Sequence, residues 1–339
     1  MQFSGQITAS GWDETVSSLG GSIFHSSVWA SYSTAVESHL SPLYITCLDD
    51  QDIVVGAALA FAEYSTRRIV NLFNKRMLLY ATPVVNNDDR VLAFFLSELE
   101  SYCRKRGFAR LDIASYASPD ISEHLTSGGY DLTHRYEFIL DLDQTEEQLW
   151  SGLSATLRKN INKAGKSGVT ILELPVADSI ASLEKLGKAT ADRILSRKGV
   201  DLRQSSSDKV KQAVLFMDQG LGRFLSAALD GEIISTSLFA QFNGIVCHML
   251  AGANDEAMKA QASKLLLWQA ITSYKAAGAR TFNLGGCKSD ATEPDSAEHG
   301  VYWFKKSFGA RVVTCASGEK ILGVKRARFF DLVRSIAGR

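Results

Sequence analysis

The chain has 339 residues, of which 45% are apolar and 22% charged, with 26 Gly and 5 Pro, a composition that excludes collagen-like and low-complexity proteins. At roughly 100 to 200 residues per domain, this length predicts two globular domains. Lys and Arg number 37, as do Asp and Glu. No net charge therefore attracts the chain to DNA or to an acidic membrane, and any polyanion would need a local basic patch.

The N-terminal sequence lacks a cationic start followed by an apolar segment, and the longest nearly apolar run, 53–62, is shorter than the roughly 20 residues that span a bilayer. We therefore expect a cytoplasmic protein with at most peripheral membrane contact. The five cysteines lie far apart, and the six histidines form no pair spaced for metal binding. Neither disulfides nor a metal site is predicted.

The first half of the chain begins with a hairpin signal. In segment 43–62, apolar and β-branched residues flank an Asp-rich turn, which predicts two paired strands. A helix with one buried face is predicted over about 88–106 from apolar residues spaced by three and four; these are Leu92, Phe95, Leu96, Leu99 and Tyr102. Gly107 ends this helix, because glycine favours the left-handed cap, and a short strand follows.

The middle of the chain carries a basic helix. Thr145 and Gln148 form a capping-box pattern, which predicts the start of a helix over 146–167. One side of this helix is apolar, and the other carries Arg158, Lys159, Lys163 and Lys166. No acidic residue interrupts this stretch, so we predict an anion site, with a solvated helix face as the alternative. The strand VTILEL follows.

The second half repeats the order of the first. Segment 223–242 predicts a hairpin with Asp230-Gly231 as its turn. A helix over about 260–277 then ends at Gly278, and the strand ARTFNLGG follows. Gly278 lies 171 residues after Gly107, which predicts an internal duplication of one α/β unit. The alternative is that any two α/β domains can be matched in this way.

The densest functional signal is segment 281–309. Here a strand ends in Gly285-Gly286, and a polar, acidic loop leads to a short aromatic helix with a Phe-Gly stop. Loops at the end of a rigid strand commonly carry functional sites. Glycines let backbone N–H groups approach a ligand oxygen closely, and Lys305 or Lys306 would supply positive charge to an oxyanion or phosphate.

The same segment contains candidates for proton transfer. Tyr302 is a candidate proton donor, and Glu298, His299 or Asp295 is a candidate acceptor. For each of these residues the alternative is a structural role, with Tyr302 in the core and the lysines in water.

Other catalytic classes lack their motifs. Segments 160–167 and 284–289 depart from the phosphate-loop pattern, and GxGxxG and GxSxG are absent from the sequence. We therefore exclude a P-loop ATPase, a Rossmann cofactor site and a serine hydrolase elbow.

Three segments together resemble the FemABX-like branch of the GNAT acyltransferase superfamily. They are LRKNINKAGKSGV at 157–169, ASKLLLWQAITSYKAAGARTFNLGG at 262–286 and GVYWFKKSFGA at 300–310. IFHSSVWASY, which contains His25 and Trp29, is similar to the entry segment of that branch. The resemblance implies an α/β (α+β) fold of two tandem GNAT-like domains, each a mixed, mainly antiparallel sheet flanked by helices. We place them at 1–145 and 146–339, with the linking helix 146–167 in the second.

The resemblance also implies site residues. Lys305 matches the lysine of the FKxxFG element near the reaction centre. The basic motif facing the substrate matches Arg158, Lys159 and Asn160. We expect the substrate to be bound by these residues together with Asn283, Gly285, Gly286, His25 and Trp29, and the catalytic residues to be Lys305, Tyr302, Glu298 and His299.

The predicted activity is transfer of an acyl group to an amine. We expect an N-acyltransferase, for example an N-acetyltransferase using acetyl-CoA, that acts on a cell-envelope, polysaccharide or peptide precursor. One alternative is a FemABX-type enzyme with aminoacyl-tRNA as donor, and another is a catalytically degenerate binding module. Segment 258–266 contains no glycine, whereas acyl-CoA enzymes of this superfamily usually carry glycines there to bind the pyrophosphate.

Overall fold

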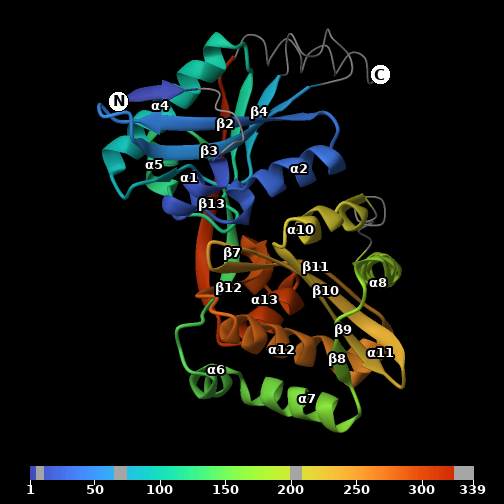
Figure 1. Cartoon of the computed structure of the whole chain (residues 1–339). Helices are drawn as coiled ribbons and strands as arrows, with labels where there is room; N and C mark the ends of the chain where they lie inside the picture. The colour runs from blue at the N-terminus through green and yellow to red at the C-terminus, as the bar shows by residue number, and fades with distance from the viewer. Residues whose placement is uncertain (5–10, 65–74, 199–207, 324–339) are drawn as a thin grey trace, which may run out of the picture. The chain divides into compact units, whose positions relative to one another are not determined.

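The structure is a computed structural model that describes residues 1–4, 11–64, 75–198 and 208–323. It divides into two compact units, of which unit 2 comprises residues 136–314 and unit 1 the described residues before and after it (Figure 1). This division differs from the expected boundary at 145/146. The segment after residue 314 belongs to unit 1, because Gly318 to Ile321 pair with a strand of that unit.

Unit 1 is a mixed sheet flanked by helices (Figure 1). Its strands are β1 (Gln2–Ser4), β2 (Leu40–Leu48), β3 (Val54–Glu63), β4 (Arg76–Leu79), β5 (Val84–Val85), β6 (Arg110–Ile113) and the end of β13 (Arg311–Ile321). Its helical segments are α1 (Trp12–Ser18), η1 (Ile23–His25), α2 (Ser27–Val36), α4 (Asp89–Lys105) and α5 (Ser122–Ser127). The strands lie in the order β1-β2-β3-β4-β6-β13, with β5 beside β3.

The predicted elements of the first half are confirmed. β2 and β3 form the antiparallel hairpin, and α4 is the predicted amphipathic helix. Phe95 and Leu99 of α4 are fully buried and belong to one core with Met77 and Leu111 of the sheet. Gly107 follows the helix with φ 75°, a conformation that a side chain would strain.

Unit 2 is built in the same way. Its strands are the end of β7 (Asp131–Asp141), β8 (Thr170–Leu172), β9 (Gly222–Leu229), β10 (Glu232–Phe242), β11 (Ile245–Ala253) and β12 (Thr281–Lys288). Its helical segments are α6 (Glu146–Gly152), α7 (Ala155–Lys166), α8 (Val176–Lys198), α10 (Val214–Asp218), α11 (Asp255–Ala260), α12 (Ala262–Ala276), η2 (Ser289–Thr292) and α13 (His299–Lys306). The strand order is β7-β12-β11-β10-β9-β8.

The two units share a topology. In unit 1, β3 pairs antiparallel with β4, and β4 pairs parallel with β6, the strand after the long helix. In unit 2, β10 pairs antiparallel with β11, and β11 pairs parallel with β12 after α12. The β9–β10 turn has φ 51° at Asp230 and 84° at Gly231, and Gly278 ends α12 with φ 83°. The order that the repeat predicted is therefore present in both units.

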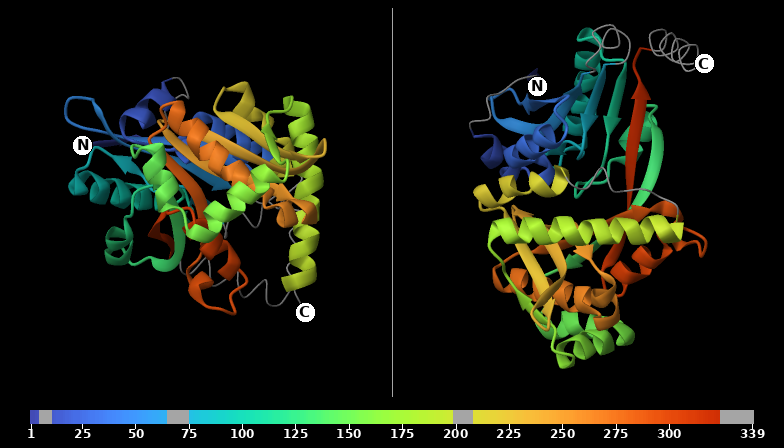
Figure 2. Two further views of the ribbon diagram at one scale, coloured as in Figure 1. Left: turned by 90° about the horizontal axis from the view of Figure 1, so that it is seen from below. Right: turned by 90° about the vertical axis from the view of Figure 1, so that its right-hand side faces the viewer.

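Helices cover both faces of the unit 2 sheet. α8 packs on one face, where Gly252 of β11 lies so close to Gly187 and Leu186 that a Cβ would clash. α12 lies on the other face, where Ser263 is hydrogen-bonded to Ser235 of β10 (3.0 Å). Figure 2 shows the two helices on different sides of these strands.

One predicted helix is two helices. The prediction of a single helix over 146–167 is wrong, because the chain is extended at Leu153 (ψ 144°) and Ser154 caps a new helix by accepting a hydrogen bond from Leu157 N. The apolar spacing continues through the break and conceals it. Tertiary contacts described below account for the break.

Candidate functional site

The candidate site lies where β11 and β12 stop pairing. These parallel strands are paired from Ile245↔Thr281 to Cys247↔Asn283, and the pairing ends there although both strands continue. A strand that leaves its neighbour presents backbone N–H and C=O groups that an extended ligand can bind. The end of the pairing is therefore a candidate ligand-binding position in unit 2.

In unit 1 the equivalent strands stay together. They pair as far as Leu79↔Ile113. Beyond this pair, Ala114 N–H donates to Leu79 O (2.8 Å) and Tyr116 N–H to Tyr80 O (3.1 Å). The two units thus share a topology and differ at this position.

Lys305 lies at the place where the pairing ends. Its Nζ donates a hydrogen bond to Gly286 O (2.9 Å). Gly285 has φ 78°, and a Cβ added there would lie 3.1 Å from Lys305 Nζ. The absence of a side chain at this position lets the ammonium group approach the backbone. The structure therefore brings together three residues that the sequence selected.

Asn283 joins this group from the interior. It is 3% exposed, and its Oδ1 accepts a hydrogen bond from Gly285 N–H (2.7 Å). Its Nδ2 donates to Glu137 Oε2 of β7 (2.9 Å). The Gly285 amide is therefore engaged, and the predicted oxyanion donors that remain are Lys305 and the Gly286 amide.

His248 was not selected from the sequence. It lies on β11 one residue beyond the last paired position, with its ring stacked on Phe239 (5.0 Å) and its Nε2 3.2 Å from Ser237 Oγ. Burial, and to a smaller extent the charge of Lys305, lower the pKa of His248 to about 3. The imidazole is therefore neutral at physiological pH. A lone histidine in a strand of mostly apolar residues is the signal that would have marked it.

Tyr302 packs as a core aromatic. It is 7% exposed, and its ring lies 5.5 Å from that of Tyr136 and 5.3 Å from that of Phe138. Lys306 is exposed, with Nζ 5.5 Å from the centre of the Tyr302 ring and 5.0 Å from that of Trp303. The two neighbouring lysines of α13 therefore have different surroundings.

Glu298 and His299 lie at the start of α13. Glu298 Oε2 accepts a hydrogen bond from Lys288 N–H (2.7 Å) and so holds the acidic loop to the end of β12. His299 Nδ1 is buried and has no hydrogen-bond partner among the described residues. Glu298 therefore has a structural role, whereas no structural role accounts for the Nδ1 atom of His299.

Arg158 holds the joint between α6 and α7. Its Nη1 donates to the carbonyl oxygens of Ser151 (2.9 Å) and Leu153 (2.5 Å), and more weakly to Trp150 (3.4 Å). These are carbonyl groups at the C-terminal end of α6, which cations stabilise. On the same helix Lys159 is exposed and Asn160 half-buried.

The FKKSFG element contacts the same joint. Ser307 O accepts a hydrogen bond from Ser154 N–H (2.9 Å). Gly309, with φ 79°, lies so close that a Cβ would be 2.7 Å from Gly152 O. The structure thus places the end of α13 against the start of the basic helix, and these contacts account for the break between α6 and α7.

His25 and Trp29 belong to unit 1. His25 is 1% exposed; its Nδ1 accepts from Ser22 N–H (3.0 Å), and its Nε2 lies 2.9 Å from Thr82 O. Burial lowers the pKa of His25. Trp29 is 8% exposed, and its ring lies 4.7 Å from that of Phe24. Both residues help to hold the N-terminal helices in place.

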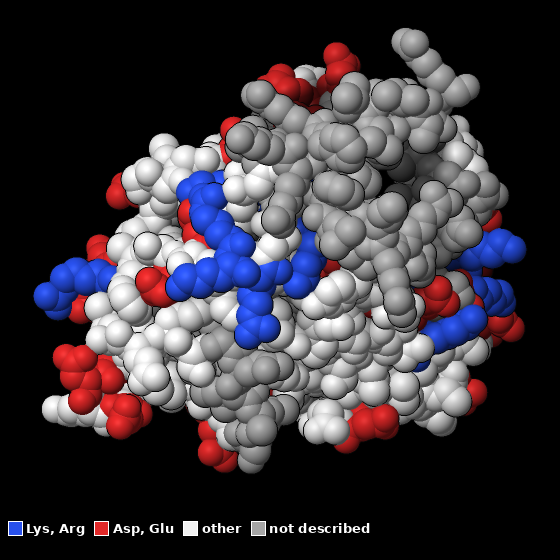
Figure 3. All heavy atoms as spheres, turned by 90° about the horizontal axis from the view of Figure 1, so that it is seen from above, with Lys and Arg blue, Asp and Glu red and all other residues white. Residues whose placement is uncertain are grey.

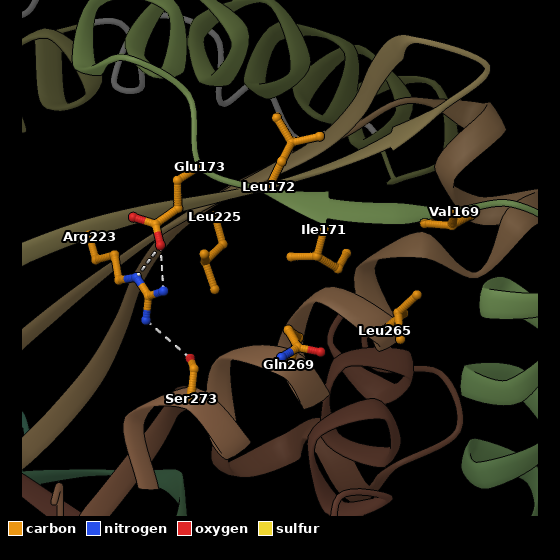
Figure 4. Close-up of a pocket in the computed structure, with 9 residues that line it drawn as sticks. All are labelled: Val169, Ile171, Leu172, Glu173, Arg223, Leu225, Leu265, Gln269 and Ser273. Carbon is orange, nitrogen blue, oxygen red and sulfur yellow. Dashed lines mark hydrogen bonds and ion pairs between the residues drawn. The ribbon is translucent and has the colours of Figure 1, made fainter. Parts of the chain in front are cut away.

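Unit 2 also has a pocket lined by none of the residues selected from the sequence. It has a volume of about 490 Å³ and lies between β8, β9 and α12. Its wall includes Ile171 and Leu225, and at one end Arg223 binds Glu173 (Nε to Oε1, 3.0 Å) and Ser273 Oγ (3.1 Å) (Figure 4). It is a second candidate position for a ligand in this unit.

The zero net charge conceals local segregation. Lys and Arg side chains gather near the middle of the face viewed in Figure 3.

Within the described part of the chain, no helix is both long and apolar enough to cross a membrane. The same residues contain no group of three His, Cys, Asp or Glu side chains arranged to hold a metal ion.

Comparison with protein families decides the assignment. A model described as "FemAB family" matches residues 122–206 and 221–330, more than half of the chain. The chain belongs to the FemAB family. This confirms the resemblance found in the sequence, and the protein is accordingly an acyltransferase that transfers an acyl or aminoacyl group. A comparison with curated proteins gives no match.

Solved structures confirm the fold class. The chain is similar to the crystal structure of FemX, with 14% identity, a TM-score of 0.79, and 97% of this chain and 99% of that chain covered. It is also similar to the C-terminal domain of a putative lysylphosphatidylglycerol synthetase from Agrobacterium fabrum (14% identity, TM-score 0.55, 95% and 97% covered). A tandem GNAT protein from the clavulanic acid biosynthesis pathway matches with 12% identity and a TM-score of 0.51, and 95% and 99% of the two chains are covered.

Proposed function

We propose that this FemAB-family protein acylates a primary amine at the end of the β11–β12 pairing, with Lys305 stabilising the oxyanion. The observation that carries the proposal is the position of the Lys305 ammonium, bound to Gly286 O beside the strand opening. An ammonium group has three N–H donors, and one of those of Lys305 is directed to Gly286 O at the end of the pairing. The unit 1 strands, which stay paired, offer no such opening at the equivalent position.

The reaction begins when the amine attacks an ester or thioester carbonyl. A tetrahedral oxyanion forms, and donors already in place stabilise it without reorganisation. Lys305 and the Gly286 amide are our candidate donors on this chain. The C–O or C–S bond then breaks, and the amine nitrogen keeps the acyl group.

The attacking amine must also lose a proton. A free alkylamine has a pKa of about 10.4 and is mostly protonated at neutral pH, so a base is required. Glu298 and His299 remain our candidates, and the unpartnered Nδ1 of His299 favours the histidine. Tyr302 remains our candidate for protonating the leaving group. His248 is too weak a base, because its pKa is about 3.

The start of α12 favours an aminoacyl ester over acyl-CoA as the donor. Anions such as a pyrophosphate bind the free N–H groups of a helix N-terminus. Here α11 ends at Ala260 and α12 begins at Ala262, with the single residue Gln261 between them. Ala262 is fully buried and Ala260 is 9% exposed. This helix end is therefore covered by α11, and we favour aminoacyl-tRNA, which was the alternative in the sequence analysis.

We propose an amine on a cell-envelope precursor as the acceptor. Membership of the FemAB family and the likeness to FemX support a peptide precursor, and a polysaccharide amine is the second candidate.

The test is a transfer assay in which purified protein, a lysine-containing cell-wall peptide precursor and either aminoacyl-tRNA or acyl-CoA are mixed. We expect product with aminoacyl-tRNA. Its KM should rise by roughly tenfold or more between about 50 and 200 mM salt, because phosphate contacts weaken steeply with salt. If product forms only when acyl-CoA is supplied, the donor is acyl-CoA, as we first predicted. No product with any amine or donor would contradict the proposed function.

A further inference from the structure

Two buried polar side chains lie behind Lys305. Glu137 of β7 is 4% exposed and Asn283 of β12 is 3% exposed. A buried polar group without hydrogen bonds costs stability, and Glu137 Oε2 accepts a hydrogen bond from Asn283 Nδ2 (2.9 Å). The pair joins two neighbouring strands across 146 positions of the sequence.

The carboxylate determines which way the Asn283 amide points. A carboxylate oxygen only accepts hydrogen bonds, so Asn283 must present its NH₂ group to Glu137. Its oxygen then points toward Gly285 and accepts the Gly285 N–H (2.7 Å). A glutamine in place of Glu137 would permit either orientation of the Asn283 amide, because its side chain both donates and accepts.

The orientation of the Asn283 amide also affects the position of Lys305. Gly285 is held in the left-handed region, with φ 78°, and the next carbonyl, Gly286 O, accepts the hydrogen bond from Lys305 Nζ (2.9 Å). Three hydrogen bonds, joined by the Gly285–Gly286 backbone, thus connect Glu137 to the ammonium group. A shift of Gly285 would move the acceptor that holds Lys305.

We propose that Glu137 and Asn283 are positioning residues, which hold Lys305 in the place required for oxyanion stabilisation. This inference rests on the proposed function of Lys305. In this role both residues act through Lys305, so Asn283 supports the site instead of binding the substrate as the sequence led us to expect.

The test uses a pair of exchanges. Asn283→Asp sets two carboxylates against each other, and Glu137→Gln lets the Asn283 amide turn. The double variant Glu137→Gln/Asn283→Asp restores the chain of bonds with the roles reversed, since the glutamine NH₂ donates to one aspartate oxygen and Gly285 N–H to the other. We expect each single variant to lower kcat by roughly 10- to 100-fold, as misplaced catalytic groups do, with KM little changed. The double variant should recover most of kcat.

A second readout needs no substrate. The labelling rate of the Lys305 amine by acetic anhydride, followed by mass spectrometry over a range of pH, reports the surroundings of this ammonium. Each single variant should change this rate by roughly threefold or more, because hydrogen bonds to the charged form alter its protonation. The double variant should return toward the wild type.

Thr236→Val is the control, because Thr236 also makes a buried hydrogen bond in unit 2, to Ser226 Oγ (3.0 Å). It should reduce stability and leave Lys305 labelling unchanged. Unchanged labelling in both single variants, or a double variant no better than Asn283→Asp, would overturn the inference. Altered labelling in a protein whose wild type shows no transfer activity would support the positioning of Lys305 and count against the proposed function alone.

Discussion

At the scale of single residues, Lys305 carries the prediction for catalysis. Lys305→Met keeps the length of the side chain and removes the ammonium group, so we expect kcat to fall by roughly 100- to 1000-fold, the effect of losing one oxyanion donor. Steady-state kinetics with the preferred donor measure this. Lys306→Met is the matched control, because Lys306 is exposed over the rings of Tyr302 and Trp303. Equal losses in the two variants would contradict the assignment.

A second residue, His248, predicts a dependence of stability on pH. Its pKa is lowered from 6.5 to about 3 in the folded protein. The unfolded chain therefore binds the proton first, and stability is lost as pH falls from 6.5 toward 3. His248→Gln should reduce this loss by up to about 1.4 kcal/mol per pH unit. Urea unfolding at several pH values checks it, and equal slopes for variant and wild type would refute it.

At the scale of elements, two variants of the basic helix α7 distinguish a structural role at its joint with α6 from an anion-binding role. Arg158→Met removes hydrogen bonds to the carbonyls at the end of α6, so we expect a loss of roughly 1.5 to 3 kcal/mol in the free energy of unfolding. Lys159→Met, on the exposed side of the same helix, should change stability by less than about 0.5 kcal/mol. Urea denaturation compares the two. If both variants keep full stability and lose substrate binding, the anion-site hypothesis replaces the structural role.

The contact of α13 with this joint gives another prediction for elements. Gly309→Ala places a Cβ about 2.7 Å from Gly152 O at a positive φ, so we expect a loss of roughly 1 to 3 kcal/mol from strain. Gly300→Ala, within α13, meets nothing within 4 Å and should stabilise by about 0.5 to 1 kcal/mol. Thermal unfolding of both variants tests the pair. If Gly309→Ala leaves the unfolding temperature unchanged, the backbone at the joint can move to accommodate the added Cβ.

The sequence predicts the elements better than their joints. Periodicity and the glycine stops located α4, α12 and their caps, because these depend on neighbours three or four positions apart. The break at Leu153 depends on Gly309 and Arg158, and apolar spacing does not record such contacts. The site follows the same rule. The sequence pointed to Lys305 and Gly285 through the FKKSFG and LGG segments. Glu137 is one of several charged residues of β7, and its partner lies 146 positions away, so no local pattern distinguishes it.

At the scale of the whole molecule, the two units share one topology and differ where their parallel strands end. The parallel strands of unit 1 stay hydrogen-bonded beyond Leu79, while those of unit 2 stop pairing at Cys247↔Asn283. Among the residues that the structure describes, a glycine pair and a lysine meet at this point in the unit 2 strands alone. The duplicated architecture therefore places its opening, and the proposed chemistry, in the second copy.

This difference predicts where a peptide acceptor will slow hydrogen exchange. Saturating acceptor peptide should protect the amides of 248–253 and 284–286 and leave those of 114–116 unchanged, because an extended peptide would pair with the strands that have separated. At about 100 times its Kd, the ligand adds about 2.7 kcal/mol, which is roughly a 100-fold slowing for amides that exchange by global unfolding. Hydrogen exchange followed by mass spectrometry resolves these peptides. If protection is confined to 169–172 and 265–273, the ligand binds instead in the pocket beside Arg223. In that case Arg223→Met should abolish the protection in the same measurement.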